Sequence, residues 1–299
     1  MNINVIGAPI KYGCDKDGVQ FGPDKLRELG LIDIIKKNGF NVYDMGNLYI
    51  PDILEECKYD WHKSAKYFGP IKDFNINLAH SVYSSLKSRS FPFVLGGDHS
   101  LGMGSIAGAS KYFKEIAVIW VDAHGDINDI DSSPSGHIHG MPLAASMNVG
   151  HPDLTNIYYE GIKVKPENVY IIGARNLDPG EEELAKNLHL NIYRQDDINN
   201  IGLEKILKDT ISKIKSSKVN GVHLSFDIDV LDSEISPGTG VPEDDGINVE
   251  EAKIILDRLL SEKFITSMDF VEFNPKLDID NKTAKICIEL LDFIFKKLN

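Results

Sequence analysis

Aspartate and histidine residues gather in short segments of this sequence at spacings that suit metal binding. Segment 122–126 reads Asp-Ala-His-Gly-Asp, and segment 227–229, much later in the chain, reads Asp-Ile-Asp. A further histidine stands in the Gly-Gly-Asp-His-Ser segment at 96–100. Carboxylates held close together repel one another or bind protons unless cations lie among them. The candidate ligands for divalent ions are Asp122, Asp126, Asp227, Asp229, His99 and His124.

This donor set is rich in oxygen, poor in nitrogen and free of sulfur, and such a set suits manganese better than zinc or copper. Two divalent ions would match the charge of the four carboxylates, and paired ions activate a water molecule at neutral pH. A lone aspartate at a strand end is more often a helix N-cap, and a lone histidine is more often an ordinary core or surface residue. Six such residues together are hard to explain by capping, so their joint occurrence favours a dinuclear metal site.

The elements that position these residues follow from the hydrophobic pattern. Short apolar runs predict roughly eight strands, at 3–6, 41–44, 93–95, 116–121, 169–172, 190–193, 222–226 and 266–271. Helix-length stretches with spaced apolar positions lie between them, among them 75–87, 101–113, 203–214, 249–260 and 282–298. Alternating strands and helices indicate an α/β fold with a parallel sheet buried on both faces. We expect one domain over 1–299, because no linker or repeat divides the chain.

Each polar cluster follows a predicted strand. The segments at 96–100, 122–126 and 227–232 come directly after strands, and Glu272-Phe-Asn-Pro follows the last one. An open doubly wound sheet and a closed eight-stranded barrel both fit the pattern, and both place ligands at the carboxyl ends of their strands. The clusters are therefore expected to converge on one edge.

Charge and cysteine content exclude other functions. The chain has 45 acidic and 32 basic side chains, for a net charge of −13, which argues against binding nucleic acid or an anionic membrane through general electrostatics. The three cysteines form no CxxC pair, so we expect neither a disulfide framework nor a zinc–thiolate site. No basic segment followed by an apolar stretch opens the chain, and no transmembrane-length apolar run occurs. A cytoplasmic protein is expected.

The motifs resemble those of the ureohydrolase family of arginases and agmatinases, and the bacterial arginases most closely. The matching segments, in the order of the family, are GGDHS at 96–100, DAHGDIN at 122–128, SPSGHIHGMP at 133–142, ARNLDPGE at 174–181, SFDIDVLD at 225–232, SPGTGVP at 236–242 and EFNP at 272–275. The resemblance covers nearly the whole chain. It implies a three-layer α/β/α sandwich on an eight-stranded, mostly parallel sheet, and thus an open sheet rather than a barrel.

The resemblance also implies a site with two Mn²⁺ ions per subunit. One ion would be held by His99, Asp122, Asp126 and Asp227, and the other by His124, Asp122, Asp227 and Asp229. The activated water would attack the guanidinium carbon of L-arginine to give L-ornithine and urea. Asp126 would accept a proton, Glu272 would orient the substrate cation and His139 would pass a proton to the leaving amine. Relatives assemble in threes, so a homotrimer or homohexamer is expected.

The resemblance also implies contacts to the α-amino group and to the α-carboxylate of the substrate. They are Asp178 and Glu181 at the α-amino group, Asn128, Ser135 and His137 at the α-carboxylate, and Val241 beside them. Asn128 and the loop around Ser135 favour arginine over agmatine, which has no carboxylate.

Several residues depart from the family pattern. His137 stands where Asn is usual, Val241 replaces Thr, Asn176 replaces an acid, and 243–246 replaces a neutral Gly-rich turn. The acidic run 243–245 is either a solvated turn or part of the entrance, where it would favour agmatine or another guanidino-amine. The alternatives are therefore a ureohydrolase of other specificity and a non-catalytic metal-binding relative. The latter is disfavoured because all candidate ligands and His139 are present together.

Overall fold

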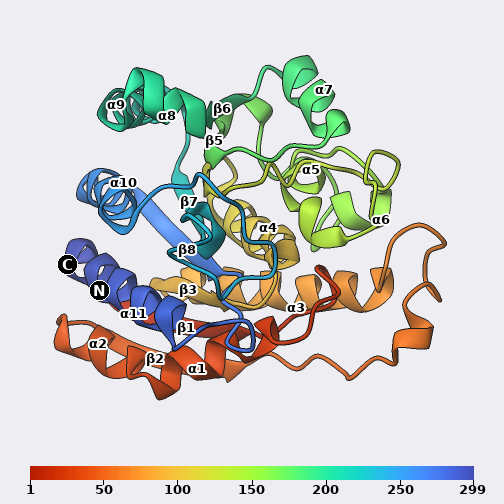
Figure 1. Ribbon diagram of the computed structural model, residues 1–299, viewed down its shortest axis with the longest axis horizontal. Coiled ribbons are helices and arrows are strands. Elements are labelled where there is room, and N and C mark those ends of the chain that lie inside the picture. Colours follow the sequence, from red (N-terminus) through yellow and green to blue (C-terminus); the bar gives the residue numbers. More distant parts are fainter.

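The predicted strands form one open sheet in the computed structural model, which describes residues 1–299 (Figure 1). The strands are β1 Asn2–Ala8, β2 Asn41–Asn47, β3 Ser90–Gly96, β4 Ile116–Val121, β5 Val169–Ala174, β6 Asn191–Arg194, β7 Gly221–Asp227 and β8 Ile265–Val271. Their order is β2-β1-β3-β8-β7-β4-β5-β6, and all neighbours run parallel. Because β2 and β6 are free edges, the sheet is not a barrel. The α/β class and the eight-stranded sheet are confirmed, and the sheet is wholly parallel.

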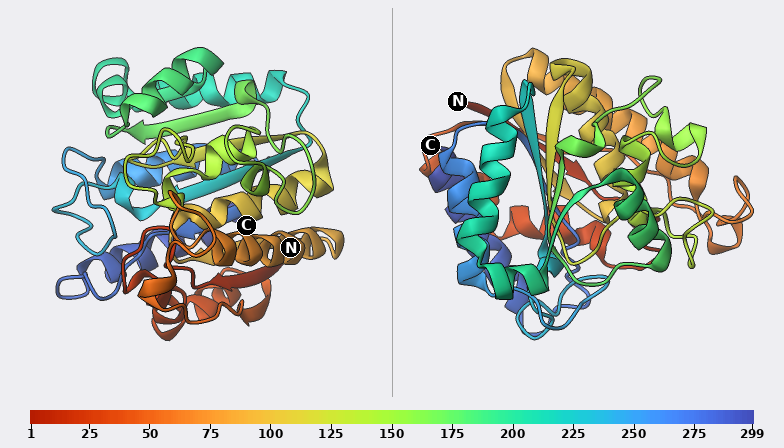
Figure 2. Two further views of the ribbon diagram at one scale, coloured as in Figure 1. Left: turned by 90° about the vertical axis from the view of Figure 1, so that its right-hand side faces the viewer. Right: turned by 90° about the horizontal axis from the view of Figure 1, so that it is seen from above.

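Helices cover both faces of this sheet and complete three layers (Figure 2). The helices are α1 Gly22–Glu28, α2 Leu31–Lys37, α3 Phe68–Lys87, α4 Gly102–Phe113, α5 Pro142–Ser146, α6 Pro152–Thr155, α7 Pro179–Leu188, α8 Gln195–Ile201, α9 Leu203–Ser216, α10 Val249–Ser261 and α11 Lys282–Leu298. Helices α2, α9, α10 and α11 pack on one face, and α3, α4 and α5 pack on the other. The architecture is the expected α/β/α sandwich.

Strand β4 shows why both faces must be covered. All six of its residues are buried. Successive side chains of a strand point to opposite faces, so Ala117, Ile119 and Val121 join the core on one side. Trp120 and Val118 join the core on the other side. A strand with no polar face is stable only between two layers of helices.

Helix α3 begins well before the expected start at 75. Its first turn contains Gly69 and Pro70, which make the segment resemble a loop in sequence. Proline is tolerated in the first turn of a helix because the N–H groups there have no intrahelical acceptor. Phe68, Ile71 and Phe74 are all buried, so helical spacing of apolar residues extends the helix toward its N-terminus.

The four strands that carry the polar clusters are neighbours in the order β3-β8-β7-β4. The carboxyl ends of parallel strands meet at the same edge, so these clusters converge as the sequence predicts. The turn after β3 is tight: Gly97 N donates to Ala8 O at 2.8 Å and Asp98 N donates to Ile10 O at 2.9 Å. A Cβ on Gly97 would lie 1.9 Å from Ile10 O. Only glycine fits there, and this turn leads directly to His99.

We predict that Gly97→Ala destabilises the protein by about 1–3 kcal/mol, because the added methyl group overlaps a backbone oxygen that has little room to move. Urea denaturation followed by circular dichroism measures the change. Gly140→Ala is the matched control, since a Cβ there meets no atom within 4 Å. Equal unfolding midpoints for the two variants would contradict this account of the turn.

Candidate metal centre and substrate cavity

The six candidate ligands come together at the carboxyl edge of the sheet. Asp122 follows β4, and Asp227 is the last residue of β7. His99 opens a short 3-10 helix, His99–Leu101, just after the turn at Gly97. Asp229 lies in a second 3-10 helix, Ile228–Val230, directly after β7. Each ligand is therefore positioned by a buried strand or by the first turn after it.

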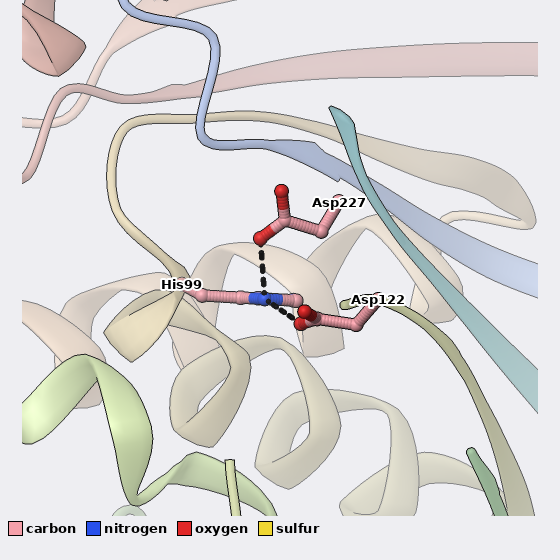
Figure 3. Close-up of side chains that lie close together, drawn as sticks. All are labelled: His99, Asp122 and Asp227. Carbon is pink, nitrogen blue, oxygen red and sulfur yellow. Dashed lines mark ion pairs between the residues drawn. The ribbon is translucent and has the colours of Figure 1, made fainter. Parts of the chain in front are cut away.

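Three carboxylates surround one nitrogen of His99. Figure 3 shows two of them, Asp122 and Asp227. His99 Nδ1 lies 2.9 Å from an oxygen of Asp122, 3.0 Å from one of Asp227 and 3.2 Å from one of Asp126. All four side chains are buried. His99 Nδ1 and Asp122 Oδ2 nevertheless form no hydrogen bond of normal geometry. A ring nitrogen and carboxylate oxygens that lie this close together, without hydrogen-bond partners, form a ligand set that fits a divalent cation.

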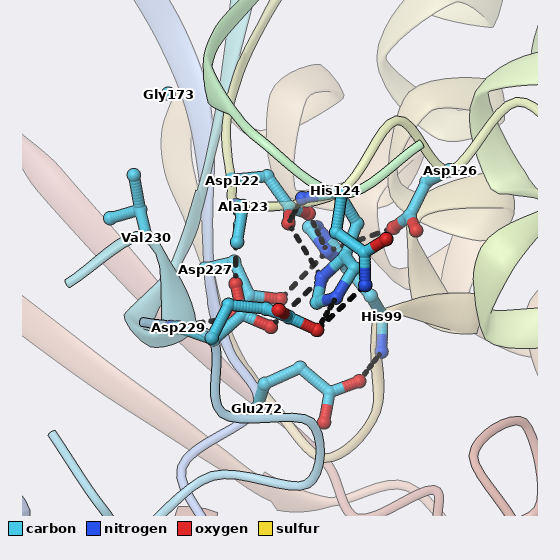
Figure 4. A network of polar contacts seen from close by, with 12 residues as sticks. His99, Asp122, Ala123, His124, Asp126, Gly173, Asp227, Asp229, Val230 and Glu272 are labelled. Carbon is cyan, nitrogen blue, oxygen red and sulfur yellow. Dashed lines mark hydrogen bonds and ion pairs between the residues drawn. The ribbon is translucent and has the colours of Figure 1, made fainter. Parts of the chain in front are cut away.

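A second group of ligands adjoins the first and shares Asp122 with it (Figure 4). His124 Nδ1 lies 3.3 Å from Asp122 Oδ1 and 3.2 Å from Asp229 Oδ2. Asp227, expected to bridge both ions, has one oxygen in the first group, while its Oδ1 accepts the N–H of Asp229 at 2.8 Å. Two buried His/Asp groups that suit metal binding are thus present side by side.

The electrostatics of the cluster also favour cations. Burial, together with neighbouring carboxylates, raises the pKa of Asp126 and Asp227 and raises that of Asp229 to about 6. Burial opposes the charging of His99 and His124, but the surrounding carboxylates raise the pKa of both rings well above the usual value. Without metal, the repulsion among the carboxylates is relieved only when protons bind to the cluster. Divalent ions can neutralise the carboxylates in place of those protons.

Side chains behind the first histidine hold it in position. His99 Nε2 lies 2.8 Å from Ser225 Oγ, and the ring stacks on Trp120 with centroids 3.8 Å apart. When a divalent ion is bound, Nδ1 must carry a free lone pair, and Nε2–H then donates to Ser225 Oγ. Ser225 is not among the residues predicted from the sequence to act at the site. The available signal is its position two residues before Asp227, on the same face of β7.

The acidic turn 243–245 is not uniformly solvated. Glu243 is half-buried, whereas Asp244 and Asp245 are exposed. Glu243 Oε1 lies 3.5 Å from His124 Nε2 and accepts a hydrogen bond from Asn176 Nδ2 at 2.7 Å. Two of the departures from the family pattern, Asn176 and Glu243, therefore contact each other behind a metal-ligand candidate.

Arg175 anchors this turn to the end of β7. Its guanidinium donates to the backbone oxygens of Asp229 and Glu243, each at 2.9 Å, and to that of Asp244 at 2.8 Å. The half-buried guanidinium of Arg175 thereby joins the segment that carries Asp229 to the segment that carries Glu243.

A cavity of about 130 Å³ opens beside the two groups. Its lining includes His124 and Asp126, together with His139 and the six predicted substrate contacts, Asn128, Ser135, His137, Asp178, Glu181 and Val241. Residues from four separate motifs of the sequence therefore face one space. The cavity thus extends from the candidate ligands His124 and Asp126 to the loop around His137.

Glu181 has a role in holding the cavity wall. One carboxylate oxygen accepts the N–H of Ile127 at 3.0 Å, and the other accepts the N–H of Asp178 at 2.8 Å. Burial raises the pKa of Glu181 to about 7. Asn128 Nδ2 donates to Asp178 Oδ2 at 2.8 Å. Glu181 and Asn128 thus fix the position of Asp178 at the cavity.

His139 and Glu272 lie on the other side of the cluster. His139 Nδ1 is 3.5 Å from Glu272 Oε1, which also accepts the backbone N–H of His99 at 2.8 Å. Burial lowers the pKa of His139, but Glu272, Asp126 and Asp98 outweigh burial and raise it. Glu272 Oε2 is buried and has no hydrogen-bond partner. Glu272 itself is absent from the cavity lining and lies behind His139 and His99.

Comparison with known proteins gives matches over the full chain. The sequence model described as "Arginase family" matches residues 1–295. Arginase from Bacillus subtilis is 41% identical over 295 residues, which cover 99% of this chain and 98% of that protein. The crystal structure of arginase from Bacillus cereus superposes with a TM-score of 0.92 at 38% identity, covering 99% and 98% of the two chains. Entamoeba histolytica arginase, solved in complex with L-ornithine, superposes with a TM-score of 0.89 at 30% identity, covering 99% of each chain.

We predict that Glu243→Gln weakens Mn²⁺ binding about tenfold, because carboxylates behind metal-bound histidines orient the ring and raise its basicity. Titration of metal-free protein with Mn²⁺ by calorimetry measures the affinity. Asp245→Asn is the matched control: it removes the same charge from an exposed position of the same turn. If both variants bind Mn²⁺ like the unmodified protein, the contact between Glu243 and His124 has no part in metal binding.

Proposed function

Because this chain belongs to the arginase family, whose members are hydrolases of linear amidines, we propose that it hydrolyses L-arginine to L-ornithine and urea. The observation that carries this proposal is the small cavity lined by His124, a member of the second His/Asp group, and by Asp126, which lies 3.2 Å from His99 Nδ1. Its acidic lining, with Asp126 and Asp178, suits a cationic guanidino substrate. The arginase with L-ornithine bound, reported for Entamoeba histolytica, supports the same assignment.

We further propose that the site holds two Mn²⁺ ions. The proposed ligands are His99, Asp122, Asp126 and Asp227 for one ion and His124, Asp122, Asp227 and Asp229 for the other. Four carboxylates and two imidazoles suit manganese by their oxygen-rich character. When bound, such a pair of ions lowers the pKa of a water molecule so that it deprotonates at neutral pH.

The side chains around the cavity have distinct roles in this proposal. Asp126 accepts a proton during attack on the guanidinium carbon. Asp126 lines the cavity, where its carboxylate is within reach of a bound substrate. The resemblance assigns Glu272 to the substrate cation, but Glu272 lies outside the cavity lining, so it acts on the substrate through His139, whose ring it contacts. The bond between the guanidinium carbon and the side-chain nitrogen of arginine then breaks. His139 gives a proton to that nitrogen, which becomes the side-chain amine of L-ornithine.

His139 suits proton donation by its position and its pKa. It lines the cavity, and the nearby carboxylates raise its pKa above the usual value. The imidazolium form is thus populated near neutral pH, and it is the form that can give a proton to the leaving amine. Glu272 keeps this ring in place, 3.5 Å away.

We also propose that residues 1–299 work as a single catalytic domain and that the protein is a cytoplasmic homotrimer or homohexamer. One sheet takes strands from residue 2 to residue 271, which supports the single domain. No helix is both long and apolar enough to span a bilayer.

A urea assay with Mn²⁺-loaded protein tests the proposed reaction. We expect L-arginine to release urea and agmatine to do so much more slowly. Preference for agmatine would support the alternative specificity that the acidic turn 243–245 suggests. Absence of urea from L-arginine, in protein with two bound Mn²⁺ per subunit, would overturn the proposal.

We predict that His139→Asn lowers kcat for L-arginine by about 10²–10⁴-fold, the range typical for removal of a general acid. Because His139 is not among the proposed metal ligands, metal analysis should still find two Mn²⁺ per subunit. Loss of metal together with activity would show that His139 acts through the metal centre instead. An unchanged kcat would rule out a rate-limiting proton transfer from His139.

A further inference from the structure

Lys66 contacts a residue of the substrate cavity, although no sequence motif marks it. Its Nζ lies 2.6 Å from His137 Nε2, and His137 lines the cavity. A lysine ammonium has three donors and no acceptor, so Nε2 of His137 accepts. The ring proton of a neutral histidine then resides on Nδ1. Burial, His139 and Lys66 lower the pKa of His137 to about 4, which agrees with a neutral ring.

Backbone packing holds Lys66 in this position. Its N–H donates to Gly136 O at 3.0 Å, in the residue just before His137. Gly136 has φ +70°, and a Cβ there would lie 2.2 Å from Ser64 O. The segment before α3 and the loop around His137 therefore touch backbone to backbone. This close approach requires glycine.

Lys66 also pairs with a carboxylate. Its Nζ lies 3.4 Å from Asp15 Oδ2, and Lys58 Nζ lies 3.6 Å from the same atom. Lys58 contacts Glu55 as well, at 3.3 Å, so the charges of these four side chains balance. Lys66 is largely covered, with 15% of its side chain exposed, and its ammonium group contacts both Asp15 and His137. Asp126 and Asp178 make the remaining lining acidic.

A second donor lies beside the His137 ring. Ser135 Oγ accepts the backbone N–H of His137 at 3.2 Å, and its own O–H proton remains to be donated. The Ser135 hydroxyl and the Nδ1–H of His137 thus offer two donors from one loop, separated by a single residue. A carboxylate accepts such a pair of donors with its two oxygens.

We propose that Lys66 is a positioning residue that favours substrates with a carboxylate: it holds the neutral ring of His137 so that Nδ1–H faces the ligand. The inference rests on the proposed function and names a residue outside the cavity lining that sets its preference for guanidino amino acids over guanidino amines.

L-Ornithine and putrescine test this inference, because they differ only by the carboxylate. We measure the binding of each to Mn²⁺-loaded protein by calorimetry. We expect Lys66→Gln to weaken the binding of L-ornithine about tenfold, which corresponds to the loss of one hydrogen bond to a charged group. The binding of putrescine should not change. Lys58→Gln is the matched control, since Lys58 contacts the same Asp15 and lies outside the cavity lining.

A double-mutant cycle separates positioning from a general structural effect. In a His137→Asn background, Lys66→Gln should have little further effect on L-ornithine, because Lys66 acts through the ring. Lys66→Arg, which keeps the donor and the charge, should retain affinity for L-ornithine. Equal weakening of L-ornithine and putrescine, or no change in either, would overturn the inference.

The outcome is independent of turnover. If the unmodified protein favours L-ornithine, loses this preference with Lys66→Gln and yet releases no urea from L-arginine, the proposed reaction fails and carboxylate selection stands. If urea forms from L-arginine but Lys66→Gln leaves L-ornithine binding unchanged, carboxylate selection fails and the proposed reaction stands.

Discussion

Four buried aspartates at one edge of a sheet are the constraint on which the rest of this structure depends. Burial raises the pKa of Asp126, Asp227 and Asp229, so the cluster has to bind either protons or cations. Holding like charges together requires a stiff support. The parallel strands β4 and β7, buried on both faces, provide it. Cations that bind only the folded cluster will also stabilise the fold through mass action.

The side chains that contact the two candidate histidine ligands also determine how those ligands are placed. Ser225 selects the nitrogen of His99 that faces the carboxylates, and Glu243 lies against His124. The pairing of Glu243 with Asn176 links two departures from the family pattern, and it leaves Glu243 engaged with the protein rather than free for a substrate cation. The acidic turn is therefore better understood as support for the metal centre than as an entrance.

The cavity combines an acidic part with a group of neutral donors. Its acidic lining is held in place by buried hydrogen bonds, such as those of Glu181. The donors are at His137 and Ser135, and His137 is held by Lys66, which lies in the segment before α3. A ligand with a cation at one end and a carboxylate at the other complements both parts. Substrate selection thus depends on contacts between segments far apart in the sequence, whereas the metal ligands all come from strand ends.

The sequence by itself determined the alternation of strands and helices and the ligand candidates. Parallel strands bring their carboxyl ends to one edge, so residues such as His99 and Asp122 were predictable from motifs after strands. Only the tertiary structure decided the strand order, the early start of α3 and the contacts of Lys66 and Glu243. Lys66 reaches His137 because two loops meet at Gly136. Such loop contacts arise from long-range packing and leave no periodic signal in the local sequence.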